Sequence, residues 1–184
     1  MRTENNAVYS LGTIKITSGR ILVSDPCYLD SAQHMFNFVE GCRNGIWKTE
    51  AEVSDEGDWG ERVAVLSARC EEPYTAWKEI GIAGVDSGQM SIMDASHLQE
   101  WGGDDRGHGW DPDAYAGDFS YQGACEITLR DGDVRGGLLA KRMAVSSSGY
   151  GDGSYPVSVG YDRNGNVVAV KIEFIWEDEG ENED

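Results

Sequence analysis

The chain has 184 residues, and 24 of them are glycine, with only 4 prolines, six tryptophans and eight tyrosines. Its 33 acidic and 15 basic residues give a formal charge of −18, which disfavours binding to nucleic acid or to anionic membranes. A small anionic molecule is not excluded, because a local pocket can oppose the overall sign.

Many glycines and aromatic residues with few long helical patterns favour a β-rich fold. We predict a mainly β (α+β) domain over residues 1–176, with a twisted antiparallel sheet, a sandwich or partly closed barrel, and one or two short helices. Residues 177–184 hold six acids and are predicted to be a disordered tail, and subtracting them from −18 leaves −12. We expect no leader or membrane span, because no long apolar run occurs.

The four cysteines are scattered without a CxxC pair, which predicts buried free thiols and no zinc site. They are Cys27, Cys42, Cys70 and Cys125.

The first predicted elements are two strands, residues 8–16 and 21–23, which we expect to form a hairpin through a turn at residues 17–20. The second strand is predicted to be buried and to end at Asp25, which Pro26 holds in an extended conformation. Asp25 is either a turn cap, through Asx-type hydrogen bonds, or a ligand contact.

Residues 31–39 are expected to form one or two helical turns, with Met35, Phe36 and Val39 on one face. Residues 46–53 and 62–70 are expected to form a second hairpin with a loop of seven to nine residues. Alternation predicts which residues of the first strand point inward and which residues of the second strand lie on one face together. The inward face holds Trp47, Thr49, Ala51 and Val53, and the other holds Val63, Val65 and Ser67.

Two further strands, residues 80–85 and 89–93, are predicted to meet at Asp86-Ser87-Gly88. Gln89, Ser91 and Met93 would then share one face of the second strand, and Met90 and Ile92 the other. Asp94 precedes a helical stretch at 95–101, so we expect it to be either an N-cap or part of a site.

Residues 102–117 are acidic, rich in glycine and irregular, which indicates a flap or an insertion. The acids do not fit a calcium-loop spacing, and His108 has no partner for a metal. Residues 119–129 are expected to be a strand, or a short helix followed by a strand. Strands at 155–161 and 166–176 are predicted to form a hairpin with a two-residue type of turn within 162–165.

The glycine-rich stretch at residues 148–156 precedes that hairpin and holds three glycines within five residues. Such a stretch is typical either of a tight β-connection or of a loop that cradles a ligand. Tyr150 and Asp152 alternate with these glycines and are candidates to contact a ligand.

Three blocks, residues 19–26, 83–89 and 148–155, together resemble the DUF4241 family, mostly bacterial and phage proteins of unknown function. Their order and spacing extend over residues 11–176. The resemblance implies a β-rich domain in the bacterial or infected-host cytosol, and it implies no catalytic residue.

If the three polar strand ends lie on one rim, they supply carboxylates, an amide, backbone N–H groups and tyrosines to a cleft. We therefore expect a non-catalytic protein that binds a small, nucleotide-like molecule without a cofactor or metal, and a homo-oligomer remains open. Tyrosines would stack on a ring, and Arg20, Lys141 or Arg142 would meet a phosphate. The candidate ligand-binding residues are Asp25, Tyr28, Asp86, Ser87, Gln89, Asp94, Tyr150, Gly151, Asp152, Gly153 and Tyr155.

Two alternatives remain. An acidic protein-interaction or inhibitor module would use the charged body and tail against a basic partner. A hydrolase, with or without a metal, would need two of Asp25, Asp86, Asp94 and Asp152 close together. No Ser-His-Asp or Cys-His arrangement is recognisable in the sequence.

Overall fold

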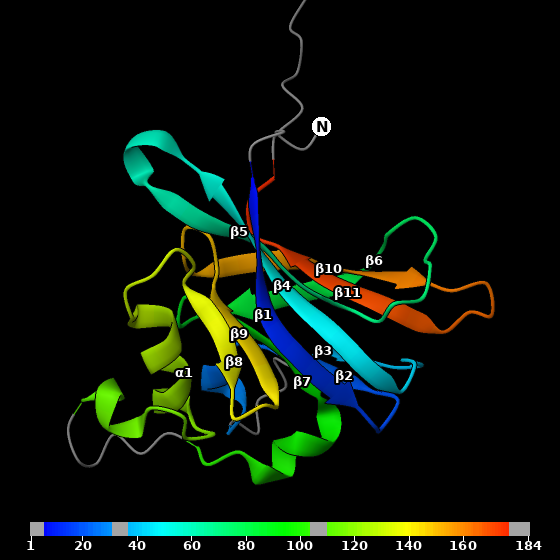
Figure 1. Cartoon of the computed structure of the whole chain (residues 1–184), viewed down its shortest axis with the longest axis horizontal. Helices are drawn as coiled ribbons and strands as arrows, with labels where there is room; N and C mark the ends of the chain where they lie inside the picture. Colours follow the sequence, from blue (N-terminus) through cyan, green and yellow to red (C-terminus); the bar gives the residue numbers. More distant parts are fainter. Residues whose placement is uncertain (1–5, 31–36, 104–109, 177–184) are drawn as a thin grey trace, which may run out of the picture.

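The computed structural model describes residues 6–30, 37–103 and 110–176, which form two antiparallel sheets (Figure 1). The six-stranded sheet has the order β1-β4-β5-β11-β10-β6, and the five-stranded sheet has the order β3-β2-β7-β9-β8. The first consists of β1 (Ala7–Ile16), β4 (Gly45–Asp55), β5 (Glu61–Arg69), β11 (Val167–Glu173), β10 (Gly153–Tyr161) and β6 (Lys78–Val85). The second consists of β3 (Asn37–Val39), β2 (Ile21–Ser24), β7 (Gln89–Asp94), β9 (Met143–Ser147) and β8 (Gly136–Leu139).

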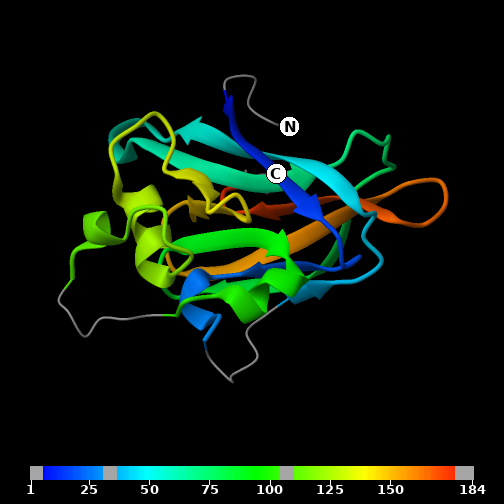
Figure 2. The same cartoon turned by 60° about the horizontal axis from the view of Figure 1, so that its bottom comes forward.

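The prediction of a mainly β fold is confirmed, and over the described residues the sheets do not close into a barrel. One α-helix, α1 (Tyr121–Leu129), packs against β8 and β9, as Figures 1 and 2 show. Short 3₁₀ turns complete the described elements: η1 (Pro26–Tyr28), η2 (Gly57–Trp59), η3 (Ala95–Glu100) and η5 (Pro112–Tyr115).

Two apolar clusters hold these layers together. The larger cluster draws side chains from both sheets, including the fully buried Trp47, and the smaller joins the five-stranded sheet to α1 through Met93 and Ile127. Met90 and Ile92 lie in the larger cluster and Met93 in the smaller, so the predicted faces of β7 are confirmed.

The predicted hairpin at the start of the chain is wrong, because its two strands belong to different sheets. β1 pairs with β4, whereas β2 pairs with β3 and β7. The turn crosses between the sheets and is held there by Asp94, whose carboxylate accepts the N–H groups of Thr17 and Ser18.

The second hairpin is confirmed as β4 and β5, and the predicted inward face of β4 is buried. The predicted face of β5 is only partly right. Glu52 pairs with Val65 but Val53 pairs with Val63, and this bulge shifts the alternation. Val63, Leu66 and Ala68 therefore reach the core, whereas Val65 and Ser67 line the outer face.

Other local predictions have mixed outcomes. Residues 37–39 form strand β3 rather than a helix, while Met35 and Phe36 lie outside the described residues. Residues 121–129 take the helical alternative. The C-terminal hairpin is confirmed, but its loop has three residues between Asp162 and Asn166, whose carbonyl accepts the Asp162 N–H.

The four cysteines are free thiols; Cys42 and Cys125 are buried, and Cys27 and Cys70 are half-buried. Across residues 6–30, 37–103 and 110–176, no helix is long and apolar enough to span a membrane. His108 and the acidic tail lie outside the described residues.

Candidate functional site

The three polar strand ends meet in the structure. The buried Asp25 carboxylate accepts the N–H groups of Asp86 at 2.8 Å and Ser87 at 2.7 Å. The next N–H group, that of Gly88, donates to Asp152 Oδ1 at 3.0 Å. The turn between β6 and β7 is thus fixed from one side by the end of β2 and from the other by the glycine-rich loop.

Asp25 also performs the capping role considered from the sequence. Its Oδ1 accepts the Cys27 N–H at 2.9 Å, and it accepts the hydroxyl of Ser87. A fully buried carboxylate with donors on both oxygens is consistent with a residue that positions the turn. Burial and the nearby Asp25 charge raise the pKa of the Cys27 thiol to about 12.

The glycine-rich loop folds around two tyrosines with different surroundings. Tyr155 lies in the core, edge-on to Phe174, and its hydroxyl donates to the Gly151 carbonyl at 2.6 Å. Tyr150 is 53% exposed, and its hydroxyl donates to Glu56 at 2.9 Å. Gly149 and Gly151 have φ values of 58° and 114°, which side-chain-bearing residues rarely adopt.

A pocket of about 630 Å³ lies beside this junction, between α1, the β4–β5 hairpin and the glycine-rich loop. Ser87, Gln89, Tyr150 and Gly151 are the predicted residues that line it. The other candidates lie outside its lining: Asp25, Tyr28, Asp86, Asp94, Asp152, Gly153 and Tyr155.

Those outlying candidates differ in their positions. Asp94 lies at the far end of β7, where it caps η3 by accepting the Ser96 N–H at 2.8 Å. Tyr28, at the end of η1, lies near Asp86. Burial, and to a lesser degree the Asp86 charge, raises the pKa of Tyr28 to about 12. Asp152 acts indirectly, because it holds the backbone of the lining residue Gly88.

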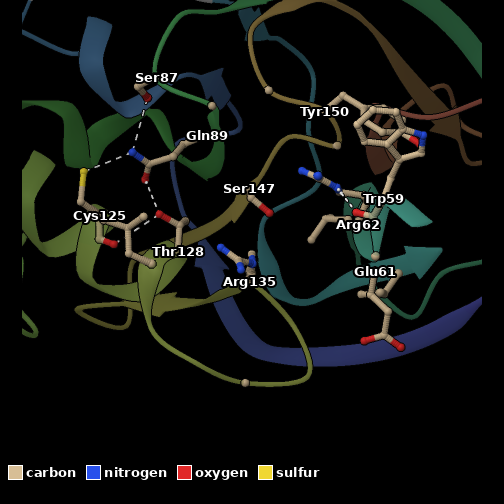
Figure 3. Close-up of a pocket in the computed structure, with 18 of the residues that line it drawn as sticks. Trp59, Glu61, Arg62, Ser87, Gln89, Cys125, Thr128, Arg135, Ser147 and Tyr150 are labelled. Atoms are coloured by element: carbon tan, nitrogen blue, oxygen red, sulfur yellow. Dashed lines mark hydrogen bonds between the residues drawn. The ribbon is translucent and has the colours of Figure 1, made fainter. Parts of the chain in front are cut away.

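The inner wall of the pocket is a hydrogen-bonded set around Gln89, which is only 4% exposed (Figure 3). Its amide nitrogen donates to Ser87 Oγ at 3.4 Å and to Cys125 Sγ at 3.3 Å. Its amide oxygen accepts the Thr128 hydroxyl at 3.2 Å. These contacts fix which end of the amide is the donor and which is the acceptor.

The opposite wall is aromatic and cationic. Trp59 and Tyr150 both line it, and the Arg62 guanidinium lies 5.3 Å from the centre of the Tyr150 ring (Figure 3). Arg62 Nε donates to the Trp59 carbonyl at 3.1 Å. Trp110 and Tyr121 add two more rings, with centroids 6.1 Å apart.

Several lining residues were not predicted from the sequence, namely Trp59, Arg62, Trp110, Tyr121, Cys125, Thr128 and Arg135. They come from the β4–β5 hairpin, the segment before η5, α1 and the segment before β8, and nothing in their local spacing links these segments. The one available signal was Trp59, a tryptophan within a polar turn.

The cations expected to meet a phosphate lie elsewhere. Arg142 pairs with Glu100 at 3.0 Å, Arg20 pairs with Glu40 at 2.7 Å, and none of Arg20, Lys141 and Arg142 lines the pocket. Among the described residues, no group of three or more His, Cys, Asp and Glu side chains is arranged to hold a metal.

Fold and site together define a two-sheet β protein that has, within its described residues, a single α-helix beside a polar and aromatic pocket. The chain belongs to the family described as "Protein of unknown function (DUF4241)", whose sequence profile matches residues 14–172. No curated protein and no solved structure matches the chain significantly.

Proposed function

We propose that the chain binds a small, nucleotide-like molecule in the pocket beside Gln89, without transforming it. The observation that carries this proposal is the convergence of four aromatic side chains and one oriented amide on a single cavity of about 630 Å³. Pockets for small ligands usually measure about 300–1,000 Å³ and combine apolar walls with a few fixed polar groups.

The aromatic rings support a flat ligand. Trp59 is 69% exposed and Trp110 is 52% exposed, although both are large and apolar. Exposed aromatic residues that gather around one cavity indicate a binding surface, because a flat ring would cover area that water now contacts. Stacking on such a ring contributes about 1–3 kcal/mol for a nucleobase.

The Gln89 amide supports a polar ring rather than a hydrocarbon. Its nitrogen donates to Ser87 and Cys125. Its oxygen accepts the Thr128 hydroxyl with one lone pair and has a second lone pair that can accept another hydrogen bond. A ligand N–H group at this wall would meet an acceptor of fixed orientation.

Isothermal titration calorimetry against a panel of nucleosides, nucleoside mono-, di- and triphosphates and dinucleotides tests this proposal. We expect at least one compound to bind, and Trp59→Ala to weaken it about tenfold through lost stacking. Trp176→Ala is the matched control, because Trp176 is also exposed, at 53%, but does not line the pocket. The absence of binding by the whole panel at millimolar concentration would falsify the proposal.

A further inference from the structure

Two arginines that line the pocket, Arg62 and Arg135, form no ion pair with an acid among the described residues. Five other arginines each pair with a carboxylate: Arg20, Arg43, Arg69, Arg130 and Arg142. Within the described ranges, neither Arg62 nor Arg135 forms such a pair, although acids outnumber bases by 33 to 15 in the whole chain.

The two guanidinium groups face the same space. Figure 3 shows Arg62 and Arg135 pointing into the gap between the Gln89–Thr128 wall and the Trp59–Tyr150 wall, with the Ser147 side chain between them. Arg62 uses Nε on the Trp59 carbonyl, which leaves its two terminal nitrogens as donors. The chain places Ser147 and Arg135 side by side, because the Ser147 N–H donates to the Arg135 carbonyl at 2.8 Å.

We propose that Arg62, Arg135 and Ser147 form an anion subsite that takes the phosphate of the pocket's ligand. This inference rests on the proposed function, which places the ring portion of the ligand in the pocket. It adds that the charged portion of the same ligand binds at this subsite. Guanidinium groups bind phosphate oxygens through paired, charge-assisted hydrogen bonds, and a serine hydroxyl adds a neutral donor. The ligand class is therefore a phosphorylated molecule with a flat polar ring.

Two acids, Glu61 and Asp133, also line the pocket, and both are exposed. Figure 3 shows the Glu61 carboxylate pointing away from the two arginines. These acids would disfavour an anion that lay at the mouth, so the subsite requires the anion to lie deeper, between the guanidinium groups.

The test uses the full chain and calorimetry with sodium pyrophosphate, followed by matched nucleosides and nucleotides. We expect pyrophosphate to bind, and Arg135→Gln to weaken it at least tenfold. Arg135 is the better variant because its side chain makes no hydrogen bond or ion pair with the described residues. Arg62→Gln and Ser147→Ala provide second variants, with thermal unfolding to confirm that they fold.

Arg163→Gln is the matched control. Arg163 is an exposed arginine in the β10–β11 turn, without an ion pair among the described residues and away from the pocket. Its loss should leave pyrophosphate binding unchanged, which separates a local contact from a change in net charge.

The outcomes distinguish the two proposals. If pyrophosphate binds through Arg135 but no nucleoside or nucleotide binds, the subsite stands and the nucleotide-like ligand is wrong. If nucleosides bind as tightly as their phosphates and Arg135→Gln changes neither, the pocket function stands and the subsite is overturned. If nothing binds, both are overturned.

Discussion

The Ser87 N–H lies 2.7 Å from Oδ2 of Asp25, a hydrogen bond between residues 62 positions apart in the chain. It connects the end of β2 in the five-stranded sheet to the turn that carries the chain from β6 into β7. Because Ser87 and Gln89 line the pocket, the pocket's inner wall depends on a carboxylate that never reaches it.

Asp25→Asn should therefore destabilise the protein by about 2–4 kcal/mol. Both carboxylate oxygens accept hydrogen bonds, whereas the asparagine side chain would place an NH₂ group, itself a donor, against one set of these donors. Urea unfolding at neutral pH measures this loss. Asp86→Asn is the control, because Asp86 is exposed and its change should stay within about 0.5 kcal/mol. Equal effects of the two substitutions would show that Asp25 has no special structural role.

Much of the fold could be predicted from the sequence because alternation specifies strands and their buried faces. Trp47 and Ala51 in β4, and Met90 and Met93 in β7, lie on the predicted faces. Alternation does not specify which strand pairs with which, so the chain crossing between β1 and β2 resembled a hairpin. A bulge also escapes alternation, because it depends on pairing with the partner strand.

The site was predicted in part, for a related reason. Strand ends with Asp, Ser, Gln and Gly have a local signature, and the structure brings these blocks together at Asp25, Ser87 and Asp152. Arg62 and Arg135 have no local signature that separates them from surface arginines. Their common place in the pocket lining follows only from the packing of the β4–β5 hairpin beside α1 and the segment before β8.

Asp94 gives the protein a pH-dependent source of stability at the opposite end of β7. Burial alone would raise the pKa of Asp94, but hydrogen bonds from the N–H groups of Thr17, Ser18 and Ser96 outweigh it and hold the pKa well below its usual range. A lowered folded-state pKa stabilises the protein above the unfolded value of about 4, and this contribution disappears as the pH falls below it.

Asp94→Asn should thus cost about 2–3 kcal/mol at pH 7, and the difference from wild type should shrink steadily below about pH 4. Urea unfolding across this range measures both proteins. A difference that is the same at pH 7 and pH 3 would contradict the assignment of the low pKa to Asp94.

The β8–β9 turn contains backbone strain that a glycine would relieve. Ala140 and Lys141 have φ values of 51° and 56°, the left-handed region that costs a residue with a side chain about 1–2 kcal/mol. Lys141→Gly should raise stability by about 0.5–1 kcal/mol, measured as a higher midpoint of thermal unfolding, because the greater freedom of glycine in the unfolded chain offsets part of the gain.

Gly165→Ala tests the same argument with the opposite sign. Gly165 has a φ of 81° and an added Cβ would meet nothing within 4 Å, so only backbone strain changes. We expect a loss of about 1 kcal/mol. A stabilising Gly165→Ala together with a destabilising Lys141→Gly would refute the assigned turn conformations.

Gly123 is the position where a single methyl group should do the most damage, although helix propensity alone favours alanine there by about 1 kcal/mol. A Cβ at Gly123 would come within 1.9 Å of the Asp118 carbonyl oxygen, a backbone atom that cannot rotate away. Gly123→Ala should therefore destabilise the protein by about 2–4 kcal/mol and displace α1, which carries Cys125 and Thr128 of the pocket wall. Urea unfolding measures the loss, and Gly132→Ala is the control because its nearest contact would be at 3.7 Å. If Gly123→Ala proved as stable as the control, the chain before α1 would have to lie farther from the helix than the structure places it.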